Sequence, residues 1–347
     1  RKSIVLLKNE DKLLPLKMEN VNKLAVIGKL ADMENTGDHG SSRVYPPYVV
    51  TPLEGIESYV GSRVEVVYDE GEDLEQVKNV VKDADCVLIV AGYTRKDEGE
   101  YVFSKGGDRE NLRLKESDEK LINTISEINL HCVVAMEGGS AIITENWREN
   151  VAAILMLWYP GMEGGSALAE ILFGKVNPSG KLPVVFPKSD DQLPFFDKDA
   201  KSITYEYYHG YKLMDKEGYL PAFPFGFGLS YTTFSYKNLR VDQDDELIKA
   251  HVDITNTGKV FGEEIAQLYV GYINPSVDRP VKELKGFGRV ALEPGETKNF
   301  TIPVKIEDLG YYDVEQKRWL VEKIEYQIFV GPSSRKEDLL EETIRIS

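Results

Sequence analysis

Short apolar runs alternate with segments of helical periodicity over roughly the first 190 residues. The runs that predict strands are residues 24–28, 64–68, 86–90, 132–136 and 153–157. Several show no polar alternation, which is typical of strands covered on both faces. Between them, residues 74–81 and 117–128 each place apolar side chains on one helical face, with Ser117 positioned to cap the second helix. This order predicts a largely parallel sheet with helices on both sides, and functional residues after the strand C-termini.

The hydrophobic period changes to two after about residue 240. Apolar and polar residues alternate in 248–254, 266–270 and 324–330, and turn residues such as Pro294-Gly295 and Gly331-Pro332 punctuate the region. Several short alternating strands within about a hundred residues are typical of an antiparallel β-sandwich.

The stretch between these two regions is rich in Tyr, Phe, Pro and Gly. It has too little periodicity for a helix and too many aromatic residues for a disordered tether, so we expect an ordered connector that fixes the two domains relative to each other. The expected organisation is therefore an α/β domain at 1–190, a connector at 191–240 and a sandwich domain at 241–347.

Composition narrows the classes of partner. The 347 residues include 58 Asp and Glu against 42 Lys and Arg, a net charge of −16. This charge repels nucleic acid and anionic lipid but leaves neutral ligands such as sugars unaffected. No run approaches the roughly 20 apolar residues that cross a bilayer, so we expect no membrane association. The sequence starts at Arg1 without an initiator Met, which suggests a cut or processed chain and leaves its localisation open.

Metal and redox chemistry find little support in the sequence. Cys86 and Cys132 both lie in apolar runs, so we interpret them as reduced core residues. The four His residues show no metal-ligand spacing. We therefore expect neither a bound metal nor a cofactor.

The first candidate for chemistry is the long segment 92–109, which follows the 86–90 strand. Long loops at strand C-termini often build sites. This one carries four carboxylates, Asp97, Glu98, Glu100 and Asp108, and Gly99 would let Glu98 approach a ligand closely. From the residues alone, a solvated acidic loop is the simpler interpretation.

The second candidate is the glycine-containing loop 35–44. It lacks both GxGxxG and GxxxxGKS, so a nucleotide site is poorly supported. Ser41 and Ser42 have no GxSxG context that would recommend either as a nucleophile. Packing or hydrogen bonding to a sugar explains this loop better.

Several sequence blocks follow one another in a fixed order. They are SIVLLKN (3–9), AVIG (25–28), VTPLEGI (50–56), YPGMEGG (159–165), NPSGKLP (177–183), PFGFGLSYTTF (224–234), QLYV (267–270) and KELKGF (282–287). Together they resemble the C-terminal α/β domain of glycoside hydrolase family 3, its junction segment and its fibronectin type III-like module. The resemblance covers essentially the whole chain and implies an α/β/α sandwich followed by an immunoglobulin-like antiparallel β-sandwich.

The resemblance also implies a retaining β-glycosidase, in which an Asp on a separate (β/α)₈ barrel attacks the anomeric carbon and a Glu of the α/β domain protonates the leaving oxygen. In the family this Glu stands in an E-G-x-D-R or G-E-G-Y context ahead of an Asp-Arg pair. Glu98, followed by Asp108-Arg109, matches that context. Glu100 is the alternative, because the extra Glu leaves the register uncertain by two positions. We expect Asp97 and Glu100 to be like-charged neighbours that help keep Glu98 protonated.

No segment of the chain offers the nucleophile, so hydrolysis by this chain alone is not expected. The implied partners are a small oligosaccharide or aryl or alkyl β-glycoside, contacted by Arg43 and Tyr101, and a barrel domain in the full-length protein. Homo-oligomer formation and the identity of the sugar stay open, with β-linked gluco-configured ends as the family's commonest substrate. The alternative is a non-catalytic carbohydrate-binding or scaffolding protein.

Overall fold

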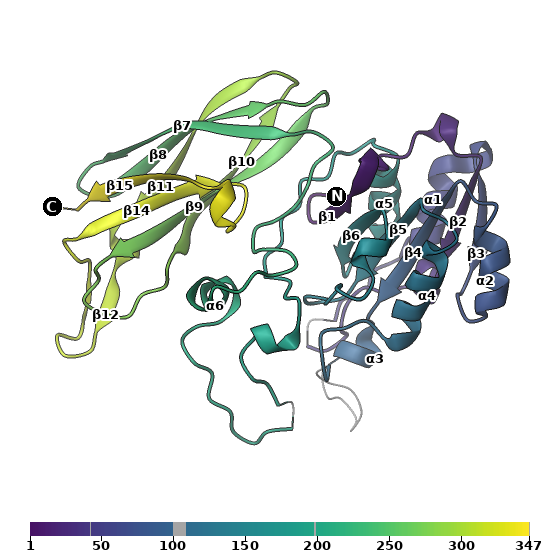
Figure 1. Ribbon diagram of the computed structural model, residues 1–347, viewed down its shortest axis with the longest axis horizontal. Coiled ribbons are helices and arrows are strands. Elements are labelled where there is room, and N and C mark those ends of the chain that lie inside the picture. Colours follow the sequence, from purple (N-terminus) through teal and green to yellow (C-terminus); the bar gives the residue numbers. More distant parts are fainter. Residues whose placement is uncertain (42, 100–108, 198, 347) are drawn as a thin grey trace.

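The computed structural model describes residues 1–41, 43–99, 109–197 and 199–346. Figure 1 shows an α/β domain on one side, a β-sandwich on the other and a connector between them.

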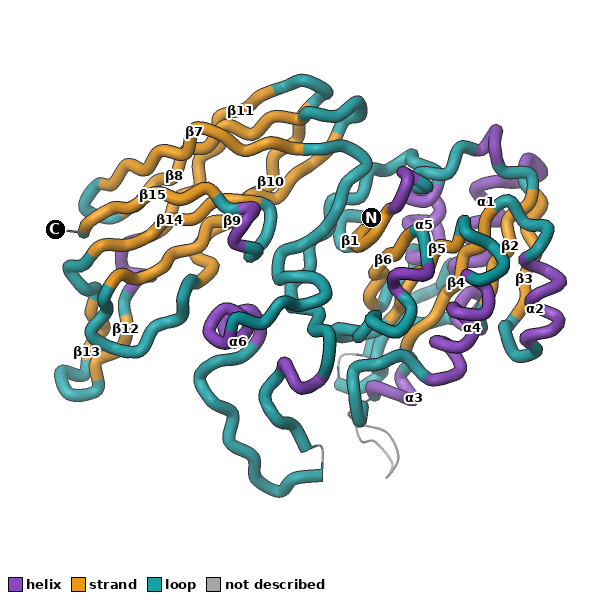
Figure 2. Tube along the Cα trace, viewed as in Figure 1, coloured by secondary structure: helices purple, strands orange, loops and turns teal. Residues whose placement is uncertain are grey.

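Six strands form the sheet of the α/β domain (Figure 2). In sheet order they are β1 (Val5–Asn9), β6 (Ala153–Trp158), β5 (Cys132–Glu137), β4 (Cys86–Gly92), β2 (Lys23–Ile27) and β3 (Glu65–Asp69). The strands from β6 to β3 are parallel, whereas β1 pairs antiparallel with β6 at the edge. The largely parallel sheet is confirmed, and all five predicted runs are strands within it.

Helices cover both faces of this sheet. The helices α1 (Pro52–Val60) and α5 (Gly164–Leu172) pack on one face, and α2 (Leu74–Val81) and α4 (Glu116–Ser126) pack on the other. This arrangement confirms the predicted α/β/α sandwich. Among the described residues, no helix combines the length and apolar character required to cross a bilayer.

Local sequence signals explain where α1 and α2 begin. Thr51 and Glu54 form a capping box at the start of α1, and the Asp73 side chain accepts hydrogen bonds from the first turn of α2. The expectation that Ser117 caps α4 is wrong. This helix begins one residue earlier with Lys115 at the N-cap, and acidic residues in its first turn supply the favourable charge instead.

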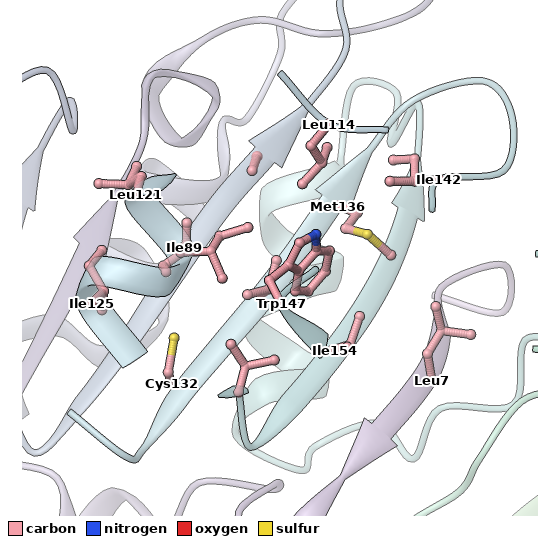
Figure 3. Close-up of a cluster of buried hydrophobic side chains, with 14 of the residues drawn as sticks. Leu7, Ile89, Leu114, Leu121, Ile125, Cys132, Met136, Ile142, Trp147 and Ile154 are labelled. Carbon is pink, nitrogen blue, oxygen red and sulfur yellow. The ribbon is translucent and has the colours of Figure 1, made fainter. Parts of the chain in front are cut away.

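The core on the α2 and α4 face is organised around Trp147 (Figure 3). This side chain is 1% exposed and lies against the strands that carry Met136 and Ile154. Cys86 and Cys132 are both buried and unpaired, as the sequence predicts.

The second domain packs two antiparallel sheets face to face, which confirms the predicted sandwich. One sheet holds β10 (Glu283–Leu292), β9 (Gly262–Ile273), β14 (Glu325–Gly331) and β15 (Leu340–Arg345), and the other holds β11 (Thr297–Lys305), β8 (Leu247–Asn256) and β7 (Phe234–Gln243). A two-stranded hairpin of β12 (Tyr311–Asp313) and β13 (Arg318–Leu320) is added at one end. The alternating apolar residues of β8 all point into the core between the sheets.

The connector is ordered and touches both domains. The backbone N–H of Leu182 donates to Phe227 O on the α/β side, and Gln267 of the sandwich donates to Gly226 O. Beside the connector, Lys181 and Glu264 form a direct, buried ion pair between the domains at 3.0 Å. The expectation of no helix here is wrong, because α6 (Gly210–Glu217) forms within it. The helix spans only eight residues, of which Met214 is the buried one, so an apolar pattern has few turns in which to repeat.

Candidate active site

The loops that follow β4, β5 and β6 meet at one edge of the α/β sheet. Parallel strands end at the same edge, so residues distant in sequence come together there. Glu98 closes the short helix α3 (Arg95–Glu98) after β4, Gly139 follows β5 and Tyr159 follows β6. The described start of the segment predicted as a site, residues 92–99, therefore lies at the carboxyl edge of the sheet.

Three groups hold the Glu98 carboxylate, one by an ion pair and two by hydrogen bonds. Arg109 Nε lies 3.1 Å from Oε1, the Gly139 backbone N–H donates to Oε2 at 2.7 Å, and the Tyr159 hydroxyl donates to the same oxygen at 2.5 Å. The Glu98 side chain is 11% exposed. A carboxyl group that is nearly buried yet reaches the surface, with its orientation fixed by three partners, has the placement that proton transfer requires.

Arg109 is itself fixed by its surroundings. Its Nη2 donates to Ala141 O at 3.1 Å, and its guanidinium stacks over the Tyr93 ring at 4.3 Å from the centroid. The planar fork lets one guanidinium serve Glu98, a backbone carbonyl and a ring face together, which a lysine ammonium cannot do.

Tyr159 and Gly139 complete the cradle around Glu98. Burial and the adjacent Glu98 both raise the pKa of Tyr159 above its usual value, so its hydroxyl remains a donor near neutral pH. A Cβ on Gly139 would lie 3.1 Å from the Tyr159 ring and 3.3 Å from Glu98 Oε2. A side chain here would crowd both groups, and glycine keeps the backbone donor close to Glu98.

Asp97 has a structural role that the sequence did not indicate. Its carboxylate accepts from the backbone N–H of Thr94 in a capping box for α3 and pairs with Lys115 at 2.9 Å. Although burial opposes it, Lys115 and Thr94 lower the pKa of Asp97 below its ordinary value. The nearest predicted like-charged neighbour of Glu98 is therefore neutralised by its own partner.

A second carboxyl group lies beneath this site. Glu137 ends β5, is fully buried and accepts a hydrogen bond from Asn35 Nδ2 at 2.8 Å. Within the described residues its Oε1 has no hydrogen-bond partner. Burial raises the pKa of Glu137 to about 8, although the Asn35 hydrogen bond opposes the shift. Glu137 is therefore predominantly protonated at neutral pH.

The loop 35–44 is tied to this layer. Asn35 also donates to Tyr93 O at 2.9 Å, and His39 Nδ1 lies 3.3 Å from an Arg95 guanidinium nitrogen. The loop therefore passes beside α3. Arg43 does not contact Glu98; it is exposed and stacks on the Tyr45 ring at 4.4 Å from the centroid.

Comparison with known proteins identifies the family. The sequence model of the family described as "Glycosyl hydrolase family 3 C-terminal domain" matches residues 4–231. The chain belongs to glycosyl hydrolase family 3. A second family model, described as "Fibronectin type III-like domain", matches residues 264–334.

Relatives within family 3 extend well beyond this chain. A "Thermostable beta-glucosidase B" of Acetivibrio thermocellus is 36% identical over 99% of the chain, which covers 47% of that relative. A "Beta-xylosidase" of Formosa agariphila is also 36% identical, over 97% of the chain and 48% of the relative. The solved β-D-glucoside glucohydrolase of Trichoderma reesei superposes with a TM-score of 0.92 at 28% identity, covering 99% of this chain and 54% of that one. The chain thus spans about half the length of these family 3 proteins.

The structure of this family 3 domain places only some of the predicted site residues at the sheet edge. The structure gives Glu98 a fixed place at the sheet edge and leaves Arg43 apart from it, while Glu100, Tyr101 and Asp108 lie outside the described residues. Sequence reasoning assigned no site role to Gly139, Tyr159 or Glu137. Two signals were available for them: the Glu-Gly-Gly that ends β5 and the Tyr-Pro-Gly that follows β6, both directly at strand C-termini.

Proposed function

We propose that this chain forms the acid/base half of a retaining, exo-acting β-glycosidase, with Glu98 as the general acid/base. The observation that carries the proposal is the cradle of Arg109, Gly139 and Tyr159, which fixes an almost buried carboxyl group at the carboxyl edge of the sheet. Glycosidases of this class require one such carboxyl group beside the leaving oxygen.

The chemistry divides into two steps. In the first, Glu98 gives its proton to the glycosidic oxygen as the bond to the anomeric carbon breaks. In the second, the Glu98 carboxylate takes a proton from the water that attacks the glycosyl-enzyme intermediate. In the present geometry Oε2 of Glu98 accepts two hydrogen bonds and Oε1 forms an ion pair with Arg109, which suits the second step. The first step requires one of these contacts to open, so that the proton can point toward the substrate.

The nucleophile belongs, in this proposal, to a (β/α)₈ barrel in the complete protein. The described residues form the α/β domain, the connector and the sandwich, and none of these is such a barrel. A retaining mechanism needs the second carboxyl group about 5–5.5 Å from the first. The proposal therefore expects no hydrolysis from this chain alone. That the chain covers about half of each relative supports this division.

The substrate is proposed to be a small β-linked oligosaccharide or an aryl or alkyl β-glycoside, by analogy with the β-glucosidase and β-xylosidase relatives. A hollow of about 970 Å³ begins at Arg109 and continues along exposed Phe195, Phe196 and Tyr205 of the connector. Its aromatic lining supports a role for this domain on the aglycone side. Arg43 and Tyr101 remain the proposed substrate contacts.

Leaving-group dependence tests the proposal in the complete protein. Glu98→Gln should lower kcat/KM by about 10²–10⁴ for alkyl glucosides, whose leaving oxygen needs protonation. Glycosylation by a dinitrophenyl glucoside, whose leaving group departs without a proton, should change little. Glu100→Gln is the matched comparison and should behave as wild type.

Two outcomes would reject the assignment. If Glu98→Gln hydrolysed both substrate classes like wild type, Glu98 would not be the acid. If Glu100→Gln showed the leaving-group dependence instead, the alternative register would be correct. A complete protein that binds β-glucosides without cleaving them would instead favour the non-catalytic binding function.

A further inference from the structure

The β12–β13 hairpin lies at the end of the sandwich that is far from the α/β domain (Figure 2). It carries a pair of exposed aromatic side chains. Trp319 is 70% exposed, and its register partner Tyr312 is 49% exposed. Their ring centroids lie 5.7 Å apart with an interplanar angle of 70°. A three-residue strand gains little core stability from such side chains, so their exposure needs another explanation.

The hairpin forms one wall of a hollow of about 760 Å³. This volume lies within the range of about 300–1,000 Å³ typical of small-molecule sites. The exposed ring of Tyr207, from the connector, lies on another wall, and polar side chains lie between. The charged residues that line the hollow are Asp278, Arg279, Glu283, Lys285, Glu307 and Asp308.

The basic groups of this hollow are already used within the protein. Arg279 stacks on Tyr272 at 3.7 Å, donates to Leu309 O at 2.9 Å and has a side chain only 7% exposed. Lys285 donates to Asp308 O at 2.8 Å and lies 3.5 Å from Glu283. An anionic ligand would find no free cation among these groups and would meet several carboxylates, so the wall disfavours phosphate and nucleic acid.

A neutral ligand that combines an apolar face with many hydroxyl groups fits the exposed rings and the polar walls of this hollow. The C–H face of a pyranose ring can lie on an exposed indole or phenol ring, while carboxylate and carbonyl oxygens at the rim accept hydrogen bonds from sugar hydroxyls. A flat hydrophobic partner could pack on the rings, but it would exclude water from the charged walls without offering them hydrogen bonds, which costs free energy.

We propose that the Trp319–Tyr312 hairpin and the adjoining hollow form a carbohydrate-binding site for a β-linked glycan chain, separate from the site at Glu98. The hairpin and α3 lie at widely separated places in the molecule (Figure 1). The site would hold the polymer near the enzyme without contributing to bond cleavage. The choice of a β-linked glycan rests on the proposed function, whereas the sugar-binding character rests on the hollow itself.

Affinity electrophoresis of the complete protein tests this inference. In native gels that contain barley β-glucan or birchwood xylan, the wild-type protein should be retarded relative to a gel without polysaccharide. Trp319→Ala should weaken binding by at least about fivefold, and Tyr312→Ala by a smaller factor. Phe287→Ala removes another exposed aromatic ring of the sandwich and should be retarded like wild type. The thermal unfolding midpoint and aryl-glucoside hydrolysis of Trp319→Ala should match wild type.

The outcomes separate this site from the catalytic proposal. Retardation that depends on Trp319 supports the site even if the protein hydrolyses no β-glucoside. A wild-type protein that migrates equally in all gels, or a Trp319→Ala protein that keeps its retardation, would overturn the inference. If Trp319→Ala instead changed the oligomeric state in size-exclusion chromatography, the hairpin would be an interface between copies, and the inference would also be overturned.

Discussion

Two carboxyl groups, Glu98 and Glu137, lie at the carboxyl edge of the same sheet but differ in exposure and in hydrogen-bond partners. Glu98 lies at the surface of this edge, where it forms an ion pair with an arginine and accepts hydrogen bonds from a backbone N–H and a tyrosine hydroxyl. Glu137 lies in the layer below, fully buried, with Asn35 as the partner of one oxygen. The segment that follows β5 links the two, because Gly139, two residues after Glu137, donates its backbone N–H to Glu98.

The difference shows that burial alone does not make a carboxyl group catalytic. Proton transfer needs access to the substrate and partners that fix the orientation of the acid, and only Glu98 combines these. Glu137 has the raised pKa that is often associated with active sites, yet its burial leaves no path to a ligand. Its structural task is to hold Asn35, and with it the start of the loop that passes α3.

The largest expected effect is the pH dependence that Glu137 gives to the free energy of unfolding. Between its ordinary value of 4.5 and the raised pKa of about 8, the folded chain holds a proton that the unfolded chain has released. The free energy of unfolding therefore falls as pH rises through this window, by an amount on the order of a few kcal/mol. Glu137→Gln keeps a neutral side chain of similar shape, so this pH dependence should disappear.

Thermal unfolding midpoints at pH 5, 6, 7 and 8 provide the measurement. The wild-type midpoint should decline by several degrees more than that of Glu137→Gln across this range. Glu75→Gln, at an exposed position of α2, serves as the control and should follow wild type. Parallel curves for wild type and Glu137→Gln would show that Glu137 is not the buried acid described above.

A smaller effect is expected at Tyr159. Tyr159→Phe removes one of the two hydrogen bonds to Glu98 and leaves the Arg109 ion pair and the Gly139 N–H in place. A hydrogen bond to a charged group contributes about 1.5–3 kcal/mol, and with two partners remaining we expect the lower end, about a tenfold loss of kcat/KM. Steady-state kinetics of the complete protein on an alkyl glucoside would measure it. A loss as large as that of Glu98→Gln would give Tyr159 a more direct role in the reaction than this comparison assigns.

Much of the fold could be predicted because its signals are local and repeated. Continuous apolar runs such as that of β4 and strict alternation such as that of β8 report strands buried on two faces or one. The sequence patterns failed to predict elements that form through tertiary contacts and not through a periodic apolar pattern. The helix α6 buries one side chain, and the antiparallel edge strand β1 forms because β6 offers an unpaired edge, which no local pattern reveals.

The site could be predicted only in part. Loop length, charge and family resemblance indicated Glu98. Arg109 belongs to the same segment as Glu98, but Gly139 and Tyr159 come from two other segments, and nothing in their spacing indicates that they meet Glu98. At Asp97, sequence proximity suggested an electrostatic effect on Glu98 but gave no indication that the same carboxylate caps α3 at Thr94 and pairs with Lys115.

Chemical rescue tests the central claim most directly. In the complete protein, Glu98→Ala with a dinitrophenyl β-glucoside should accumulate the glycosyl-enzyme, because no base remains to activate water. Azide needs no such base, so adding it should accelerate turnover and yield the β-glucosyl azide with retained configuration. Glu98→Ala that turns over without azide at the wild-type rate, or azide product formed by Glu100→Ala instead, would contradict the assignment of Glu98 as the acid/base.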